Sequence, residues 1–337
     1  MTDQLTETGV VPGPIGPGTT APEADSLGRY VTRQVLRRLG QLIILVLSIS
    51  TLLFFLLRLT GDPAIVLLGD LSTQEDLDRV REFYGLDRPL IVQYGLFILQ
   101  ALRLDFGQSL INLQDAMSLV MDKLPATIQL AFAAVLLNVT VALGVGGWLG
   151  YRPERITRRA GLMTVLVSQG IPGFVIGLVL IQVFAVELRW LPSIGNDGFK
   201  SLILPALTLA SFLLPRAIRL TAANVDAAMK EDFVRTARAA GAKPSTVLWR
   251  HVLPNAVLGT LALVGVQFGF LLSGSLITET LFAWPGVGLQ LIEAVRALDF
   301  PVVQATVAVV AVLVFAVTTI VDLLFPLIDP RLRSQRA

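Results

Sequence analysis

Long apolar runs, separated by short polar and charged segments, dominate this chain. A helix needs roughly 20 mostly apolar residues to cross a bilayer. Five runs come near that length, over residues 39–57, 126–151, 162–185, 257–277 and 302–325. A sixth run, 202–214, is short and has to extend to about Ile218 to cross. The pattern therefore predicts an all-α integral membrane protein with six transmembrane helices.

Composition supports a membrane protein and excludes several other classes. Hydrophobic residues make up 54% of the 337 residues and charged residues only 15%, and the mean hydropathy is +0.71. Soluble domains carry about 25% charged residues. A net charge of +2 is too small to indicate a nucleic-acid partner. Because the chain has no cysteine, a disulfide framework, a thiol nucleophile and a thiolate metal site are all excluded.

The distribution of basic residues tests the number of spans. With six spans and the N-terminus inside, 18 of the 27 basic residues fall on the cytoplasmic side, as the positive-inside rule requires. Omitting the short fourth span would place the basic loop 216–255 outside. We therefore expect six spans with both termini in the cytoplasm.

This topology divides the chain into five segments. Residues 1–28 are predicted to be a disordered cytoplasmic tail, because they are rich in proline, glycine and threonine. Residues 29–60 form an amphipathic elbow helix and the first span, and residues 61–123 form an extracytoplasmic helical segment. Residues 124–325 contain the five-helix core with the cytoplasmic loop 216–255, and residues 326–337 are a cytoplasmic tail.

The extracytoplasmic segment carries its own helix signals. Thr73 with Asp76 resembles a capping box that starts a helix over Glu75–Tyr84, and Gly85 ends it. Pro89 opens a further helix that continues to about Leu104.

Residues 230–255 form a polar island between two apolar runs. Glu231–Ala240 favours a helix with acidic residues at its start, and Gly241 sits where a glycine ends a helix. Ser245 is expected to cap a second helix through Arg250, which Pro254 then interrupts. The sequence predicts a short rigid protrusion for a soluble partner.

This protrusion resembles the cytoplasmic loop of ABC importer permeases, whose pattern is Glu-Ala-Ala, three residues, Gly, nine residues, Ile, one residue, Leu-Pro. Ala237, Gly241 and the pair Leu253-Pro254 are in register. Arg235, Thr236 and His251 depart from the pattern. These departures, within DFVRTARAAG and RHVLPNA, are similar to the dipeptide/oligopeptide/nickel permeases, first-permease (B-type) branch. Further stretches resemble the same branch: GDPA at Gly61, LDRPLIVQY at Leu86, DFGQSL at Asp105, TETLFAWPGVG at Thr278 and DPRLR at Asp329.

The resemblance implies a type I ABC importer permease fold in the inner membrane of a prokaryote. It implies a second permease subunit of different sequence, two ATP-binding subunits and an extracytoplasmic binding protein that delivers peptides or similar small solutes. The branch includes carriers of dipeptides, oligopeptides, glutathione, nickel complexes, sugars and opines. This chain would bind no cofactor, since ATP and Mg belong to the partner ATPases. The residues that would contact an ATPase are Glu231, Asp232, Phe233, Arg235, Thr236, Ala237, Arg238, Ala240, Gly241 and Ala242.

A second group of residues are candidates for the pore or its gate. The segment 278–295 is too short to cross the membrane, and Trp284-Pro285-Gly286 interrupts its helical pattern. This predicts a re-entrant hairpin or an outer gate. Uncharged polar residues inside spans either line the path or bond neighbouring helices, and Glu279 is either a gate contact or a solvated end residue. The candidates are Gln169, Gln182, Gln267, Gln304, Glu279 and Trp284.

Two other function classes make demands that the sequence does not meet. An ion-coupled secondary transporter usually keeps an ionisable residue at mid-membrane, and Asp322, the nearest case, lies close to the inner boundary. An intramembrane enzyme needs a nucleophile or metal set, and the sequence contains no Walker A, GxSxG or HExxH motif and one histidine. The chain is therefore expected to be a non-catalytic subunit of an ATP-driven importer.

Overall fold

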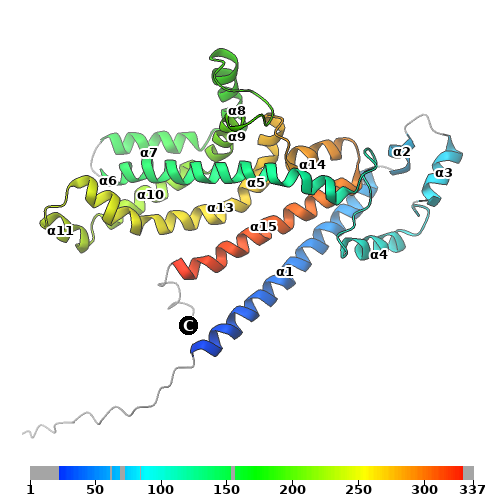
Figure 1. Ribbon diagram of the computed structural model, residues 1–337, viewed down its shortest axis with the longest axis horizontal. Coiled ribbons are helices and arrows are strands. Elements are labelled where there is room, and N and C mark those ends of the chain that lie inside the picture. The colour runs from blue at the N-terminus through cyan, green and yellow to red at the C-terminus, as the bar shows by residue number, and fades with distance from the viewer. Residues whose placement is uncertain (1–22, 61–62, 69–72, 84, 153–155, 329–337) are drawn as a thin grey trace, which may run out of the picture. The chain divides into compact units, whose positions relative to one another are not determined.

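A computed structural model describes residues 23–60, 63–68, 73–83, 85–152 and 156–328, and these residues form helices and no named strand. The chain divides into two compact units, residues 1–41 and 42–337, and the boundary falls within the first helix. The helices, shown in Figure 1, are α1 Glu23–Thr60, α2 Pro63–Leu68, α3 Gln74–Phe83, α4 Leu90–Ala101, α5 Ala116–Val141, α6 Gly147–Tyr151, α7 Ile156–Ser168, α8 Gly173–Leu180, α9 Phe199–Ser211, α10 Leu214–Ala228, α11 Asp232–Ala239, α12 Pro244–Thr246, α13 Leu253–Leu281, α14 Val287–Arg296 and α15 Phe300–Ile328. Three π-helical stretches, Ala142–Gly146, Ile181–Glu187 and Val247–Val252, join α5 to α6, extend α8 and join α12 to α13.

Helix α1 covers both the predicted elbow and the predicted first span. It begins at Glu23, so the last residues of the predicted disordered tail are helical, because Glu23–Leu27 contains no proline or glycine that would stop a helix. The rest of that tail, residues 1–22, and residues 329–337 of the C-terminal tail lie outside the described residues. The DPRLR stretch falls in the latter.

Among the described residues, four helices are long and apolar enough to cross a membrane: Leu36–Leu56, Ala116–Tyr151, Pro244–Leu272 and Phe300–Val321. Two bent helix pairs, α7 with α8 and α9 with α10, also qualify if each pair is one span. Counted in that way, the described residues contain the six predicted spans.

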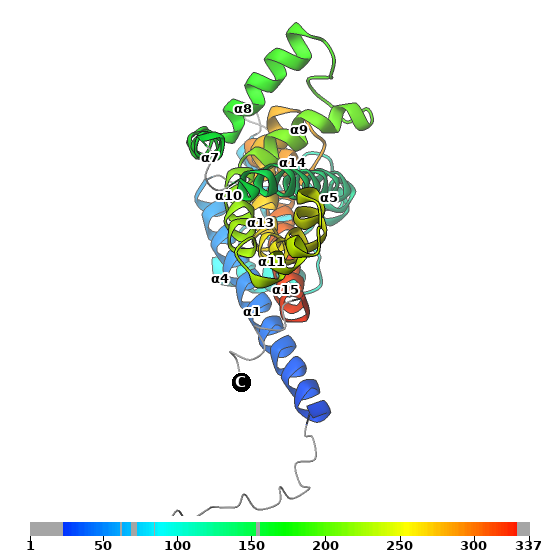
Figure 2. The ribbon, with the colours of Figure 1, turned by 90° about the vertical axis from the view of Figure 1, so that its left-hand side faces the viewer.

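The predicted third span, residues 162–185, is present only as a bent helix pair. Helices α7 and α8 meet at an angle of 99°, across the break Gln169–Pro172. Pro172 disfavours helical backbone in the residue before it and has no N–H for the helix ladder, and Gly170 adds backbone freedom. Figures 1 and 2 show α8 projecting away from α5 and α13.

The short fourth run extends as predicted, but it bends. Helix α9 ends at Ser211, and α10 restarts at Leu214 with Pro215 in its first turn and runs on to Ala228, at an angle of 64° to α9. Proline is well suited to the first turn of a helix, where its missing N–H has no partner to lose.

Helices α5, α9, α10, α13 and α15 form the core of the second unit. One buried cluster joins Leu130 of α5, Leu209 of α9, Leu271 of α13 and Trp284. A second joins Ala142, Leu149, Ile218 of α10 and Val264 of α13. Figure 2 shows α5, α10 and α13 gathered together. We call the end of this bundle that carries α11 the α11 end, and the opposite end, with α14, the α14 end.

Glycines spaced four residues apart bring the core helices into close contact. A Cβ added at Gly146 would lie 2.7 Å from the Ile218 carbonyl oxygen, and one added at Gly150 would lie 2.5 Å from the Ala222 carbonyl oxygen. Added Cβ atoms at Gly177 and Gly265 would lie 2.6 Å from Leu281 and Val321, respectively. Close backbone approach of this kind supports helix association in lipid, where burial of apolar surface gives no driving force.

Gly150→Ala is expected to destabilise the bundle by about 1–3 kcal/mol, because the new methyl group collides with backbone that has no rotamer to change. Gly144→Ala is the matched control, since nothing lies within 4 Å of a Cβ at that position. Thermal unfolding in detergent measures both variants. Equal midpoints for the two would contradict the packing of α6 against α10.

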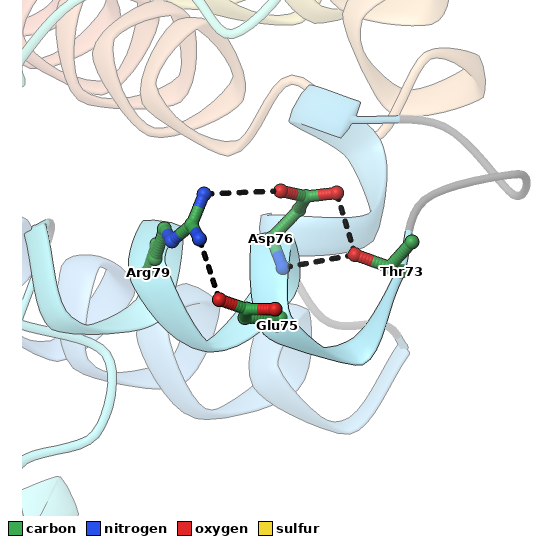
Figure 3. A network of polar contacts seen from close by, with 4 residues as sticks. All are labelled: Thr73, Glu75, Asp76 and Arg79. Carbon is green, nitrogen blue, oxygen red and sulfur yellow. Dashed lines mark hydrogen bonds and ion pairs between the residues drawn. The ribbon is translucent and has the colours of Figure 1, made fainter.

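The predicted capping box at the start of α3 is present (Figure 3). The Thr73 hydroxyl donates to Asp76 Oδ2 at 2.6 Å and accepts from the Asp76 N–H at 3.3 Å. Arg79 pairs with Glu75 at 2.6 Å and with Asp76 at 3.5 Å. At the other end Gly85, with φ +64°, donates to the Glu82 carbonyl, as predicted; Tyr84 lies outside the described residues. Helix α4 starts after Pro89, also as predicted, and ends at Ala101, three residues earlier than expected.

Candidate functional site

Helix α11 is a short element at the α11 end of the bundle, and a glycine closes its C-terminal end. Gly241 has φ +79°, a conformation that suits glycine. The Gly241 N–H donates to the Arg238 carbonyl at 3.0 Å, and the Ala242 N–H donates to the Ala237 carbonyl at 3.1 Å. These two bonds form a Schellman motif, and Ala237 and Ala242 both pack on one buried cluster. The predicted helix and its glycine stop are therefore confirmed.

One face of α11 is anchored and the other is exposed. Val234 is completely buried, together with Val247, Val252 and Leu253. Phe233 is 38% exposed, and Arg235 is paired with Asp232 at 3.2 Å with 79% of its side chain accessible. The other exposed predicted residues of this segment are Glu231, Thr236, Arg238, Ala240 and Gly241. The segment thus presents a polar face with one aromatic ring, held from behind by an apolar core.

The predicted second helix of the protrusion differs from the structure. Lys243, and not Ser245, is its N-cap, and Pro244 occupies the first turn. Pro254 does not interrupt it, because Val247–Val252 widens into a π-helix before the proline and α13 continues from Leu253. The wider turn accommodates a residue that has no N–H to donate. The protrusion is therefore continuous with the long helix α13.

An ion-pair cluster ties the neighbouring helices together near this segment. Asp226, near the end of α10, lies 3.2 Å from Lys230 Nζ and 3.6 Å from Arg158 of α7. The side chains of Asp226 and Arg158 are each 20% exposed. This cluster was not predicted from the sequence.

At the α14 end, Glu279 is completely buried and caps a helix to which it is not adjacent in sequence. Glu279 Oε2 accepts from the N–H groups of Gly288 at 2.6 Å and Leu289 at 3.1 Å, in the first turn of α14. Glu279 Oε1 accepts from the Thr127 hydroxyl of α5 at 2.7 Å, and Thr127 Oγ1 accepts from the Val287 N–H at 2.9 Å. Because the positive end of a helix dipole favours an anion, this arrangement fastens α14 to α13 and α5. A solvated position for Glu279, one of the two interpretations of the sequence, is wrong.

The glycines of the WPGVG stretch make room for this carboxylate. A Cβ at Gly286 would lie 2.5 Å from Glu279 Oε2, and a Cβ at Gly288 would lie 2.7 Å from the Leu276 Cα. Trp284 is completely buried and donates from Nε1 to the Ala126 carbonyl of α5 at 2.9 Å. The predicted break at Trp284–Gly286 is confirmed, and the chain after it returns along α13 as α14.

The four candidate glutamines do not converge on one path. Gln169 is exposed at the break between α7 and α8, and Gln182 donates to Glu187 at 3.2 Å on the exposed extension of α8. Gln267 is 4% exposed inside the bundle, and neither of its amide atoms has a hydrogen-bond partner among the described residues. Gln304 is half-buried at the α14 end and lines a cavity.

Sequence reasoning missed several buried polar residues. Asn138 of α5 is 1% exposed, and both of its amide atoms also lack a partner in the described part of the chain. Asp299, 3% exposed, accepts from the Ser109 hydroxyl and from the Leu110 N–H at 3.1 Å, which joins the loop before α5 to the start of α15. These residues carry no local sequence motif, so only the fold identifies them.

Two family models match most of the chain. "Binding-protein-dependent transport system inner membrane component" matches residues 142–334, and the corresponding N-terminal model matches residues 31–131. The glutathione transport system permease protein GsiC of Escherichia coli K12 is 35% identical over 305 residues, which cover 89% of this chain and 98% of that protein. The GsiC protein of Salmonella typhi is 34% identical over 304 residues, with the same coverage of both chains.

Solved structures support the same fold. Two crystal forms of the inward-facing MetNI methionine ABC transporter contain a similar chain. The alignment covers 63% of the present chain and 97% of that chain. The TM-scores are 0.51 and 0.52, with sequence identities of 18% and 20%. At this identity the likeness concerns the fold alone.

Proposed function

This chain belongs to the inner-membrane components of binding-protein-dependent transport systems, the permeases of ABC importers, and we propose that it translocates short peptides of the glutathione kind. Its class is that of the peptide, oligopeptide and nickel permeases, and it is a multi-pass membrane protein. A family of transport permeases is not a catalytic family. The proposed solute follows from the GsiC relatives, which align with nearly the whole chain.

We further propose its partners: a second permease, two ATP-binding subunits that carry ATP and Mg, and an extracytoplasmic binding protein. The α11 end would face the cytoplasm together with both termini, as the distribution of basic residues requires. The loop from residue 61 to residue 123 and the α14 end would then face the binding protein.

The exposed face of α11 is the observation that carries the coupling mechanism. In this proposal, Arg235 and Arg238 meet acidic residues on an ATPase while Phe233, Ala237 and Ala240 pack against it. Because α11 is capped at Gly241 and anchored through Val234, a displacement of the segment is transmitted to α13 as a rigid movement. Moving a two-state equilibrium from 1:99 to 99:1 needs about 5.5 kcal/mol of differential binding, which nucleotide on the partner subunits would supply.

Uptake into vesicles by the complete importer tests this function. With ATP inside and the binding protein outside, we expect uptake of labelled glutathione that persists when ionophores collapse ion gradients. The importer with its ATPases omitted is the control. Uptake by the permease alone, driven by a proton or sodium gradient, would instead establish an ion-coupled secondary transporter.

A further inference from the structure

A cavity of about 250 Å³ lies at the α14 end, between elements far apart in sequence. It is lined by the end of α1, the turn before α4, the inward side of α4, the loop before α5 and the first turn of α15. Drug-sized ligands occupy pockets of roughly 300–1,000 Å³. This cavity is slightly smaller, which suits a solute of two amino-acid residues.

Four phenylalanines line the cavity. Phe54 of α1 stacks with Phe97 of α4 at 5.4 Å between ring centroids, and Phe106 and Phe300 also line it. The Arg58 guanidinium lies over the Phe54 ring, 5.2 Å from its centroid, so a positive charge sits beside apolar surface. A guanidinium has five N–H donors in a fixed plane and binds a carboxylate through two of them.

Three glutamine amides also line the cavity. Gln93 is 8% exposed, and its Nε2 donates to the carbonyls of Leu86 at 2.9 Å and Arg88 at 2.7 Å. Because both partners are acceptors, the orientation of this amide is fixed. Its Oε1 has no hydrogen-bond donor among the described residues, and a buried acceptor of this kind is unusual in proteins. Gln100 and Gln304 add two further amides.

We propose that this cavity binds a short peptide on its way into the translocation path. The peptide carboxylate would pair with Arg58, a peptide N–H would donate to Gln93 Oε1, and an apolar side chain would lie against Phe54 and Phe97. This inference rests on the proposed function, because the α14 end receives the solute only in that topology. The proposed site is distinct from the solute site of the binding protein, because here the permease itself selects for a free carboxylate.

Direct titration tests the cavity. The purified importer, with its second permease and ATPases but without the binding protein, is titrated calorimetrically with glycyl-phenylalanine and with glycyl-phenylalaninamide, which lacks the carboxylate. We expect saturable binding of the dipeptide and at least about tenfold weaker binding of the amide. Arg58→Met should remove the difference between the two probes, and Gln304→Met should weaken both. Arg103→Met and Gln114→Met, at exposed positions outside the cavity, are the matched controls and should change neither.

Three outcomes would overturn the proposal. The first is a lack of saturable dipeptide binding by an importer that still takes up glutathione with its binding protein, a result that leaves the proposed function standing. The second is binding that neither Arg58→Met nor Gln304→Met changes. The third is an Arg58→Met variant that binds the dipeptide as the wild type does but captures the binding protein more weakly. That result would make the cavity a docking site for the binding protein. Failure of ATP-driven peptide uptake by the wild-type importer is a separate result that refutes the proposed function.

Discussion

Replacing Arg235 and Arg238 together with glutamate is expected to reduce ATP-driven uptake at least about 100-fold, because charge pairs at protein interfaces contribute about 1.5–7 kcal/mol each and reversal replaces attraction with repulsion. Both side chains lie on the exposed face of α11, so the fold of the chain should be unaffected. Uptake into vesicles measures transport, and the ATPase rate measures whether binding protein still stimulates hydrolysis. We expect the binding protein to lose that stimulation.

Arg235→Lys with Arg238→Lys is the matched control, since it keeps both positive charges at the same exposed positions of α11 and should leave uptake nearly unchanged. A second test within the segment is Gly241→Pro, because proline fixes φ near −65° whereas Gly241 has φ +79°. Gly241→Asn should transport normally, since asparagine tolerates this backbone conformation and nothing lies within 4 Å of an added Cβ. Normal uptake by the double glutamate variant would refute the coupling role of α11.

Much of the fold could be predicted because its determinants are local. The stop of α11 at Gly241, the cap of α3 at Thr73 and the break at Trp284–Gly286 each depend on residues adjacent in sequence. The glycine pairs that contact α10 and α15 follow from a four-residue spacing. Each of these features obeys a rule about one helix or one turn.

The incorrect predictions concern residues whose role depends on distant parts of the chain. Pro254 was expected to end a helix, but a π-helical turn accommodates it. The third span breaks at Gln169–Pro172, a bend that the apolar run 162–185 did not indicate. Glu279 could not be assigned, because its partner Thr127 lies 152 positions away in sequence. The cavity beside Arg58 likewise joins α1, α4 and α15, which no local pattern brings together.

Glu279→Ala is expected to release α14 from the bundle and to cost about 2–5 kcal/mol, because it leaves the buried Gly288 N–H and the half-buried Leu289 N–H without an acceptor. Hydrogen exchange of residues 282–296 should accelerate relative to that of α13, and uptake by the importer should decrease. Glu293→Ala removes an exposed carboxylate from the same helix and should leave the hydrogen exchange of these residues unchanged.

The Thr127 hydroxyl allows the local nature of this effect to be checked. Thr127→Val removes both the donor to Glu279 and the acceptor of the Val287 N–H, whereas Thr127→Ser retains them. We therefore expect Thr127→Val, but not Thr127→Ser, to increase exchange in the same residues. In a double-mutant cycle, Thr127→Val and Glu279→Gln should be less than additive, because each disturbs the same hydrogen bond. Strict additivity of the two substitutions, or unchanged hydrogen exchange at α14 in Glu279→Ala, would contradict this role of the carboxylate. Either result would mean that apolar packing of Trp284 and Val287 holds α14 in place.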